Sequence, residues 1–142
     1  MSIEVAAIVS LLVGIAAGAL GLRALSASGR HTTIAVRQNP QGWHSETGDQ
    51  TVRLKRLMSM RWHIEEQTPL PREAHIELRF AGDNSPFTER RPKDDRRPRR
   101  TIGALVPTGV ENASYKYEVW LIDGEAASRL EDPVIVIEGK RG

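Results

Sequence analysis

The chain has 142 residues, a formal net charge of +2, 39% hydrophobic residues, 27% charged residues and no cysteine. This length suits one domain better than two. The lack of cysteine excludes disulfides, iron–sulfur clusters, zinc–thiolate sites and a cysteine nucleophile.

The first predicted element is a membrane-spanning helix within residues 1–24. Residues 5–22 carry no charge and are mostly apolar. A helix of that length spans roughly 27 Å, close to the thickness of a bilayer's hydrocarbon core. Residues 1–4 contain no lysine or arginine, and the apolar run is longer than the core of a signal peptide. We therefore expect a retained anchor rather than a cleaved signal peptide.

Small residues recur at every fourth position of this helix and so form a stripe along it. They are Ala6, Ser10, Gly14 and Gly18. In lipid, small residues let two helices approach closely, whereas burial of apolar side chains gives little association. The stripe predicts packing against another integral membrane subunit, and the GxxxG at 14–18 also permits a homodimer. The alternative is a plain anchor whose glycines reflect membrane-helix composition.

The positive charges near the anchor follow it: they are Arg23, Arg30 and Arg37. Lysine and arginine are retained on the cytoplasmic side of a membrane. We therefore expect a single-pass protein of a bacterial inner (plasma) membrane. The linker, residues 25–31, is short, so the domain at residues 32–142 is expected in the cytoplasm and close to the membrane.

Residues 32–142 contain short alternating or β-branched runs separated by Pro, Gly, Asn and Asp turns. Strands are expected at 32–36, 52–64, 76–80, 101–106, 114–122 and 134–137, and one helical turn is expected at 125–130. The run 52–64 is long enough for one strand or for two in succession. Six to eight short strands with almost no helix predict an all-β, antiparallel Greek-key β-sandwich or a barrel after the single transmembrane helix.

The closing part of the chain combines ASYKYEV at 113–119, an Asp-Gly turn at 123–124 and DPVIV at 132–136. This combination resembles the closing hairpin of cupredoxin-like and immunoglobulin-like sandwiches. The resemblance implies a Greek-key sandwich in which a tyrosine at the start of the penultimate strand ties down a corner. A blue-copper centre requires a cysteine thiolate. The resemblance therefore concerns the fold and not an activity.

The candidate metal segment is MSMRWH at 58–63. Thioethers and imidazole suit Cu(I) or Ag(I), and the run is similar to the Met-x-Met-Arg-aromatic segment of small periplasmic copper/silver chaperones. In a strand, however, Met58 and Met60 point to the face opposite His63. We therefore expect core methionines and no cofactor or metal. A copper/silver carrier that uses Met58, Met60 and His63 is the alternative.

Residues 89–100, ERRPKDDRRPRR, offer nothing apolar to bury and predict an exposed loop within the domain. Its basic residues are Arg90, Arg91, Lys93, Arg96, Arg97, Arg99 and Arg100. They are candidates for binding anionic membrane lipid or an acidic protein partner. The alternative is a merely solvated loop. Nucleic acid is not an expected partner, because aromatic residues for base stacking are missing.

No HExxH, GxSxG, P-loop or GxGxxG motif occurs. None of the four histidines has another at two or four residues' distance in the sequence. We therefore expect no enzyme, but a non-catalytic accessory or assembly subunit of a larger membrane complex, such as a bioenergetic one. A membrane-tethered enzyme with an unrecognised site is the remaining alternative.

Overall fold

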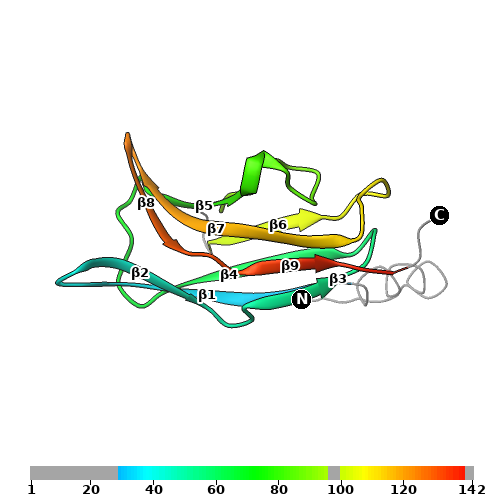
Figure 1. Ribbon diagram of the computed structural model, residues 1–142. Helices are drawn as coiled ribbons and strands as arrows, with labels where there is room; N and C mark the ends of the chain where they lie inside the picture. The colour runs from blue at the N-terminus through cyan, green and yellow to red at the C-terminus, as the bar shows by residue number, and fades with distance from the viewer. Residues whose placement is uncertain (1–28, 96–99, 140–142) are drawn as a thin grey trace, which may run out of the picture.

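The computed structural model describes residues 29–95 and 100–139, which form an all-β domain (Figure 1). Their strands form two mixed sheets. Within this part of the chain, no helix is long and apolar enough to cross a membrane. The predicted anchor, residues 1–24, lies outside the described residues.

The first sheet has the strand order β2-β1-β4-β6. Its strands are β1 (Arg30–Asn39), β2 (Gly42–Thr47), β4 (Ser59–Glu66) and β6 (Thr101–Leu105). β1 and β2 form an antiparallel hairpin that turns at Gly42, whose φ of 121° is open to glycine but rarely to other residues. β4 runs parallel to β1, and β6 runs antiparallel to β4.

The second sheet has the order β3-β9-β7-β5, and β8 also pairs with β7. Its strands are β3 (Thr51–Leu54), β5 (His75–Phe80), β7 (Ala113–Asp123), β8 (Ala126–Glu131) and β9 (Val134–Ile137), and the 3-10 turn η1 (Ala81–Asp83) follows β5. β7 pairs with β9 through its first half and with β8 through its second. The β7–β8 hairpin curves away from the body of the domain (Figure 1).

The sheets are mixed, so the expectation of a purely antiparallel fold is wrong. β1 pairs in parallel with β4, and β3 pairs in parallel with β9. After β2 the chain contributes β3 to the other sheet and then returns to place β4 beside β1. The alternation of apolar and polar residues along a strand does not predict this arrangement. Parallel pairing depends instead on where the connecting segments cross from one sheet to the other.

Two local predictions also have a definite outcome. The run 52–64 is two strands, β3 and β4, which lie in different sheets and are separated by a turn containing Leu57 at a φ of 69°. The helical turn predicted at 125–130 is wrong, because this segment is β8. Gly124, at a φ of 64°, closes a tight turn that pairs Ala126 with Asp123 in a hairpin.

Both sheets contribute to one core. Its fully buried side chains include Ile34, Met60, Trp62 and Ile102 from the first sheet and Ile76, Leu78, Tyr117, Ile135 and Ile137 from the second. The Trp62 ring lies 6.0 Å from that of Tyr117 and 5.6 Å from that of Phe87, measured between centroids. Apolar burial of this kind is the main favourable contribution to folding.

Glu131, at the end of β8, joins the two sheets through its carboxylate. The carboxylate accepts hydrogen bonds from Ser45 Oγ at 2.6 Å and from Thr47 Oγ1 at 2.8 Å. It also accepts the backbone N–H of Thr47 at 3.1 Å and the side-chain amide of Gln50 at 2.9 Å. β2, an edge strand of the first sheet, is thereby held against the second sheet.

Tyr115 ties the start of β7 to the connection before it. Its hydroxyl donates a hydrogen bond to the backbone carbonyl of Glu111 at 2.9 Å. A tyrosine bond of this kind is what the resemblance to cupredoxin-like and immunoglobulin-like sandwiches implies at a Greek-key corner. The resemblance itself stays a prediction.

Candidate functional site

β4 presents two chemically different faces. Met60 and Trp62 point into the core and are 1% and 0% exposed, whereas Arg61 and His63 are exposed. Met58, in the turn before β4, is also buried. The methionines are core side chains, as predicted. Although Met60 borders the same hollow as His63, both methionine side chains are buried, whereas His63 points to the outer face of β4. The alternation of β4 therefore separates the thioethers from the imidazole that a copper/silver carrier would need.

The parallel pairing of β1 with β4 brings together two histidines that lie far apart in the sequence. In the strand register, His31 is opposite Arg61 and Thr33 is opposite His63. His31, Arg61 and His63 therefore lie on the same outer face of the sheet. The rings of His31 and His63 stand edge to face, with centroids 5.8 Å apart and an interplanar angle of 77°.

A hollow of about 620 Å³, here called the histidine hollow, adjoins this pair. Gly103 of β6 lies opposite Arg61. No atom lies within 4 Å of the position that a Cβ would occupy on Gly103, so its missing side chain leaves the surface open. The residues that give the hollow its chemistry are Arg30, His31, Arg61, His63, Glu89 and Gly103. Two imidazoles, two guanidiniums and a carboxylate therefore line one concave surface.

Short spacings along the chain give no sign of this site. His31 and His63 become neighbours through the pairing of β1 with β4, and these strands are separated by β2 and β3. The sequence offered one signal: alternation along the strand places His63 on the outer face, opposite to the face of Met60 and Trp62. This alternation predicts that His63 is exposed, but it does not identify a neighbouring residue on another strand.

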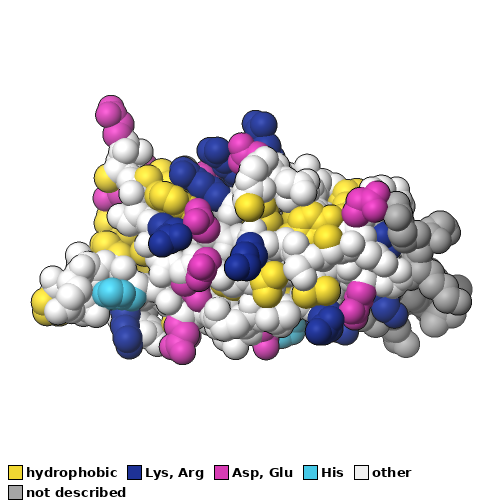
Figure 2. All heavy atoms as spheres, in the orientation of Figure 1, with side chains coloured by type: hydrophobic (Ala, Val, Ile, Leu, Met, Phe, Trp, Pro, Cys, Tyr) yellow, Lys and Arg dark blue, Asp and Glu magenta, His cyan; other side chains and the backbone are white. Residues whose placement is uncertain are grey.

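The predicted basic loop, residues 89–100, is exposed over part of its length. Arg90, Arg91 and Lys93 are exposed, and Arg91 Nε lies 3.1 Å from a carboxylate oxygen of Asp83. On the face shown in Figure 2, basic and acidic side chains are interspersed. Three further basic residues of the loop lie outside the described residues: Arg96, Arg97 and Arg99.

The middle of this loop extends the edge of the second sheet beside β5. The Leu78 N–H donates to the carbonyl of Pro92 at 2.8 Å, and the Asp94 N–H donates to the carbonyl of Ile76 at 3.0 Å. Pro92 and Asp94 are buried. The expectation of a wholly exposed loop is wrong here, because backbone hydrogen bonding to an open sheet edge holds the segment in place.

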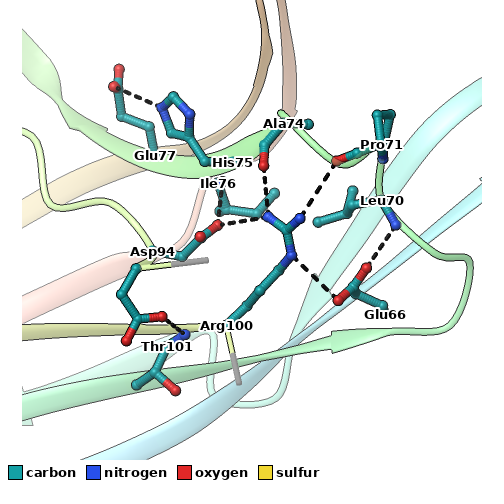
Figure 3. A network of polar contacts seen from close by, with 11 residues as sticks. Glu66, Leu70, Pro71, Ala74, His75, Ile76, Glu77, Asp94, Arg100 and Thr101 are labelled. Carbon is teal, nitrogen blue, oxygen red and sulfur yellow. Dashed lines mark hydrogen bonds and ion pairs between the residues drawn. The ribbon is translucent and has the colours of Figure 1, made fainter. Parts of the chain in front are cut away.

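Arg100, at the end of the loop, has most of its side chain covered, and its guanidinium lies within a network of polar contacts (Figure 3). Its side chain is 10% exposed, its Nη1 donates to the carbonyl of Ala74 at 2.7 Å, and its Nε lies 3.3 Å from a Glu66 oxygen. Nη1 also lies 3.5 Å from Asp94 Oδ2, which accepts the Ile76 N–H at 2.6 Å. Arg100 is therefore a structural residue, and its assignment to a binding surface is corrected.

The residues predicted to pack the anchor on a partner helix lie outside the described residues: Ala6, Ser10, Gly14 and Gly18. Among the residues that the structure does describe, no group of three or more histidine, aspartate or glutamate side chains could hold a metal ion.

No protein-family model matches the chain, and neither does any curated protein. The likeness of its closing segment to cupredoxin-like and immunoglobulin-like sandwiches rests on the residues at 113–136 alone.

Proposed function

We propose that the chain is a membrane-anchored, non-catalytic accessory subunit of a larger membrane protein complex. Residues 1–24 anchor it in the inner (plasma) membrane and pack on an integral membrane subunit through the small-residue stripe. The β-domain, a Greek-key sandwich of the immunoglobulin-like or cupredoxin-like type, lies in the cytoplasm and braces a surface of the complex.

The observation that supports this role most directly is where the domain exposes apolar surface. Among the described residues, the large hydrophobic side chains that are exposed are Leu57 and Leu105, at 57% and 42%. Leu105 lies opposite Ser59 in the strand register, and the Leu57 N–H donates to the carbonyl of Val106 at 2.7 Å. Both leucines therefore lie at the start of β4.

The chain leading from the proposed anchor reaches the domain at this same end. Arg30, the first residue of β1, is opposite Met60, which is opposite Ala104 of β6. A subunit that packs on residues 1–24 would therefore meet this end of the domain first. Burying the exposed parts of two leucines contributes on the order of 2 kcal/mol. That is too little to hold a free domain, but it is enough to orient one that a membrane anchor keeps at high local concentration.

Site-specific photo-cross-linking in native membranes tests the proposal. A cross-linking amino acid in place of Leu105 should give adducts with integral membrane proteins. The same amino acid in place of Gln41, in the exposed β1–β2 turn at the other end of β1, is the matched control and should give few. Adducts at Gln41 but not at Leu105, or at neither position, would contradict the proposed bracing surface.

A second candidate role is contact with anionic lipid or an acidic protein surface through the exposed part of the basic loop. The exposure of Arg90 and Lys93 supports it. Such a contact is electrostatic, and exposed charges are screened within about 10 Å at 0.1 M salt. The yield of adducts from a cross-linker at Lys93 should therefore fall steeply as the salt concentration is raised. Adducts at Leu105 should be less sensitive to salt.

A further inference from the structure

The histidine hollow presents two imidazole side chains whose ring nitrogens are available. Within the described ranges, neither His31 nor His63 takes part in a hydrogen bond or ion pair, and their contact is with each other. The other two histidines differ: His44 Nε2 lies 3.0 Å from Asn39 Oδ1, and His75 Nε2 lies 3.7 Å from a Glu77 oxygen. The two histidines with no such polar partner are thus the two that meet.

We propose that His31 and His63 together bind a divalent transition-metal ion at the surface of the β1–β4 pair. The remaining coordination positions are filled by water or by a group from a binding partner. Nothing in the sequence alone points to this pair, and the proposal goes beyond the accessory role described above.

The distance between the rings suits a shared ion. A zinc–nitrogen bond of about 2.1 Å places an imidazole ring centre roughly 3.2 Å from the metal. Two such rings have centres about 5 Å apart when the ligands subtend a tetrahedral angle, and about 6.4 Å apart when they stand on opposite sides of the ion. The observed 5.8 Å lies between these limits. The separation of the rings therefore suits one shared ion, provided that the side chains turn so that a nitrogen of each ring faces it.

The donor set selects the class of ion. Neutral imidazole suits Zn²⁺, Cu²⁺ and Ni²⁺, whereas hard cations such as Mg²⁺ and Ca²⁺ prefer oxygen ligands. Glu89 lines the same hollow and offers a carboxylate, while the guanidiniums of Arg30 and Arg61 oppose a cation. Two protein ligands beside two positive side chains give a labile, open site rather than a resident structural metal. Cu²⁺ should bind more tightly than Ni²⁺ or Zn²⁺, as is general for nitrogen ligands.

Calorimetry tests the proposal: the untagged, full-length protein in detergent is titrated with Cu²⁺ or Zn²⁺, and the heat of binding is measured. We expect one ion per chain. His31→Ala and His63→Ala should each weaken binding by about 10²-fold, because loss of one ring turns a chelate into a single ligand. His44→Ala is the matched control and should bind as the wild type does. Both target histidines are exposed, so their variants should unfold at the same temperature as the wild type.

Three results would overturn the proposal. The first is equal affinity in the wild type and in the His31→Ala, His63→Ala double variant. The second is binding that survives this double change but is lost in Met58→Leu with Met60→Leu, which would place the ion on the thioethers. The third is that inorganic phosphate without metal shifts the NMR signals of both rings while Zn²⁺ shifts neither, which would make the hollow an anion site built on Arg30 and Arg61.

Discussion

The indole N–H of Trp62 donates a hydrogen bond to the hydroxyl of Tyr117 at 3.1 Å, across the space between the two sheets. The two residues are 0% and 1% exposed, and their rings stand edge to face at 73°. The bond satisfies the single polar group of Trp62 inside an apolar core. It therefore fixes β4, which carries His63 on its other face, against β7.

Tyr117→Phe should destabilise the domain by about 1–3 kcal/mol, because it keeps the ring but leaves the buried indole N–H without its acceptor. Urea unfolding of the full chain in detergent measures the change. In a double-mutant cycle with Trp62→Phe, the combined loss should be smaller than the sum of the single losses. A single-variant loss below about 0.5 kcal/mol would mean that the bond adds nothing to stability.

The same residue predicts a dependence of stability on alkaline pH. Burial raises the pKa of the Tyr117 phenol above its ordinary value of about 10; the hydrogen bond with Trp62 opposes the shift, and the negative charges of Glu131 and Asp49 add to it. Above pH 10 the unfolded chain loses this proton while the folded chain keeps it. The contribution of Tyr117 is therefore complete below about pH 10 and falls by about 1.4 kcal/mol per pH unit above it.

The comparison that isolates this effect is the difference in unfolding free energy between wild type and Tyr117→Phe. It should be constant from about pH 8 to pH 9.5 and should shrink above pH 10, since only the wild type has this phenol to ionise. A difference that stays constant up to pH 11 would show that the phenol is not protected from ionisation in the fold.

Arg100 and Arg90 should differ sharply, although both belong to the basic run. Arg100→Met removes the cation beside the Asp94 carboxylate, which is 0% exposed, and should cost about 3–5 kcal/mol. Arg90→Ser changes an exposed side chain and should stay within about 0.5 kcal/mol of the wild type. Urea unfolding of the two variants measures both changes in unfolding free energy. If the two changes are equal, the ion pair with Asp94 does not stabilise the fold.

Alternation along the chain was sufficient to predict the all-β class and the faces of β4 and β7. Met60 and Trp62 of β4, and Tyr115 and Tyr117 of β7, are buried as their shared parity indicates. This works because a strand's side chains alternate strictly between faces. The turn at Asn39–Gly42 was also readable, since its residues have the backbone preferences that a turn requires.

The sequence could not supply features that depend on which strands become neighbours. The parallel pair β1–β4, and with it the contact of His31 with His63, comes from the path of the chain between sheets. Arg100 shows the same limit, because an arginine within a charged run looks like its exposed neighbours until Asp94 and Glu66 are placed beside it. Composition describes a segment, whereas burial is a property of its surroundings.

The side of the membrane on which the domain lies is predicted to be cytoplasmic, from Arg23, Arg30 and Arg37 after the anchor. A reporter fused after Gly142 that is active only in the cytoplasm should therefore give a signal. The change Arg23→Ser, combined with lysines placed after Met1, moves positive charge to the other side of the anchor. Part of the protein molecules should then insert with the opposite orientation. A fusion active only on the outer side would show that the charge rule does not set this topology.

In the proposed role, the small-residue stripe packs the anchor into a larger complex. The double change Gly14→Leu with Gly18→Leu separates membrane insertion from helix association. Two leucines raise the hydrophobicity of the helix and so preserve insertion. They also block the close approach of a partner helix, which should weaken association by about 1–3 kcal/mol. Val9→Leu with Ala16→Leu adds the same residues away from the stripe and serves as the control.

Co-purification from the same solubilised membranes is the deciding measurement. The wild type and the Val9, Ala16 control should recover integral membrane subunits, and the Gly14, Gly18 variant should stay in the membrane fraction but recover few of them. If cross-linking of the wild type gives only a self-adduct, the stripe forms a homodimer. Equal recovery of partners by all three proteins would show that the stripe does not hold the anchor in a complex.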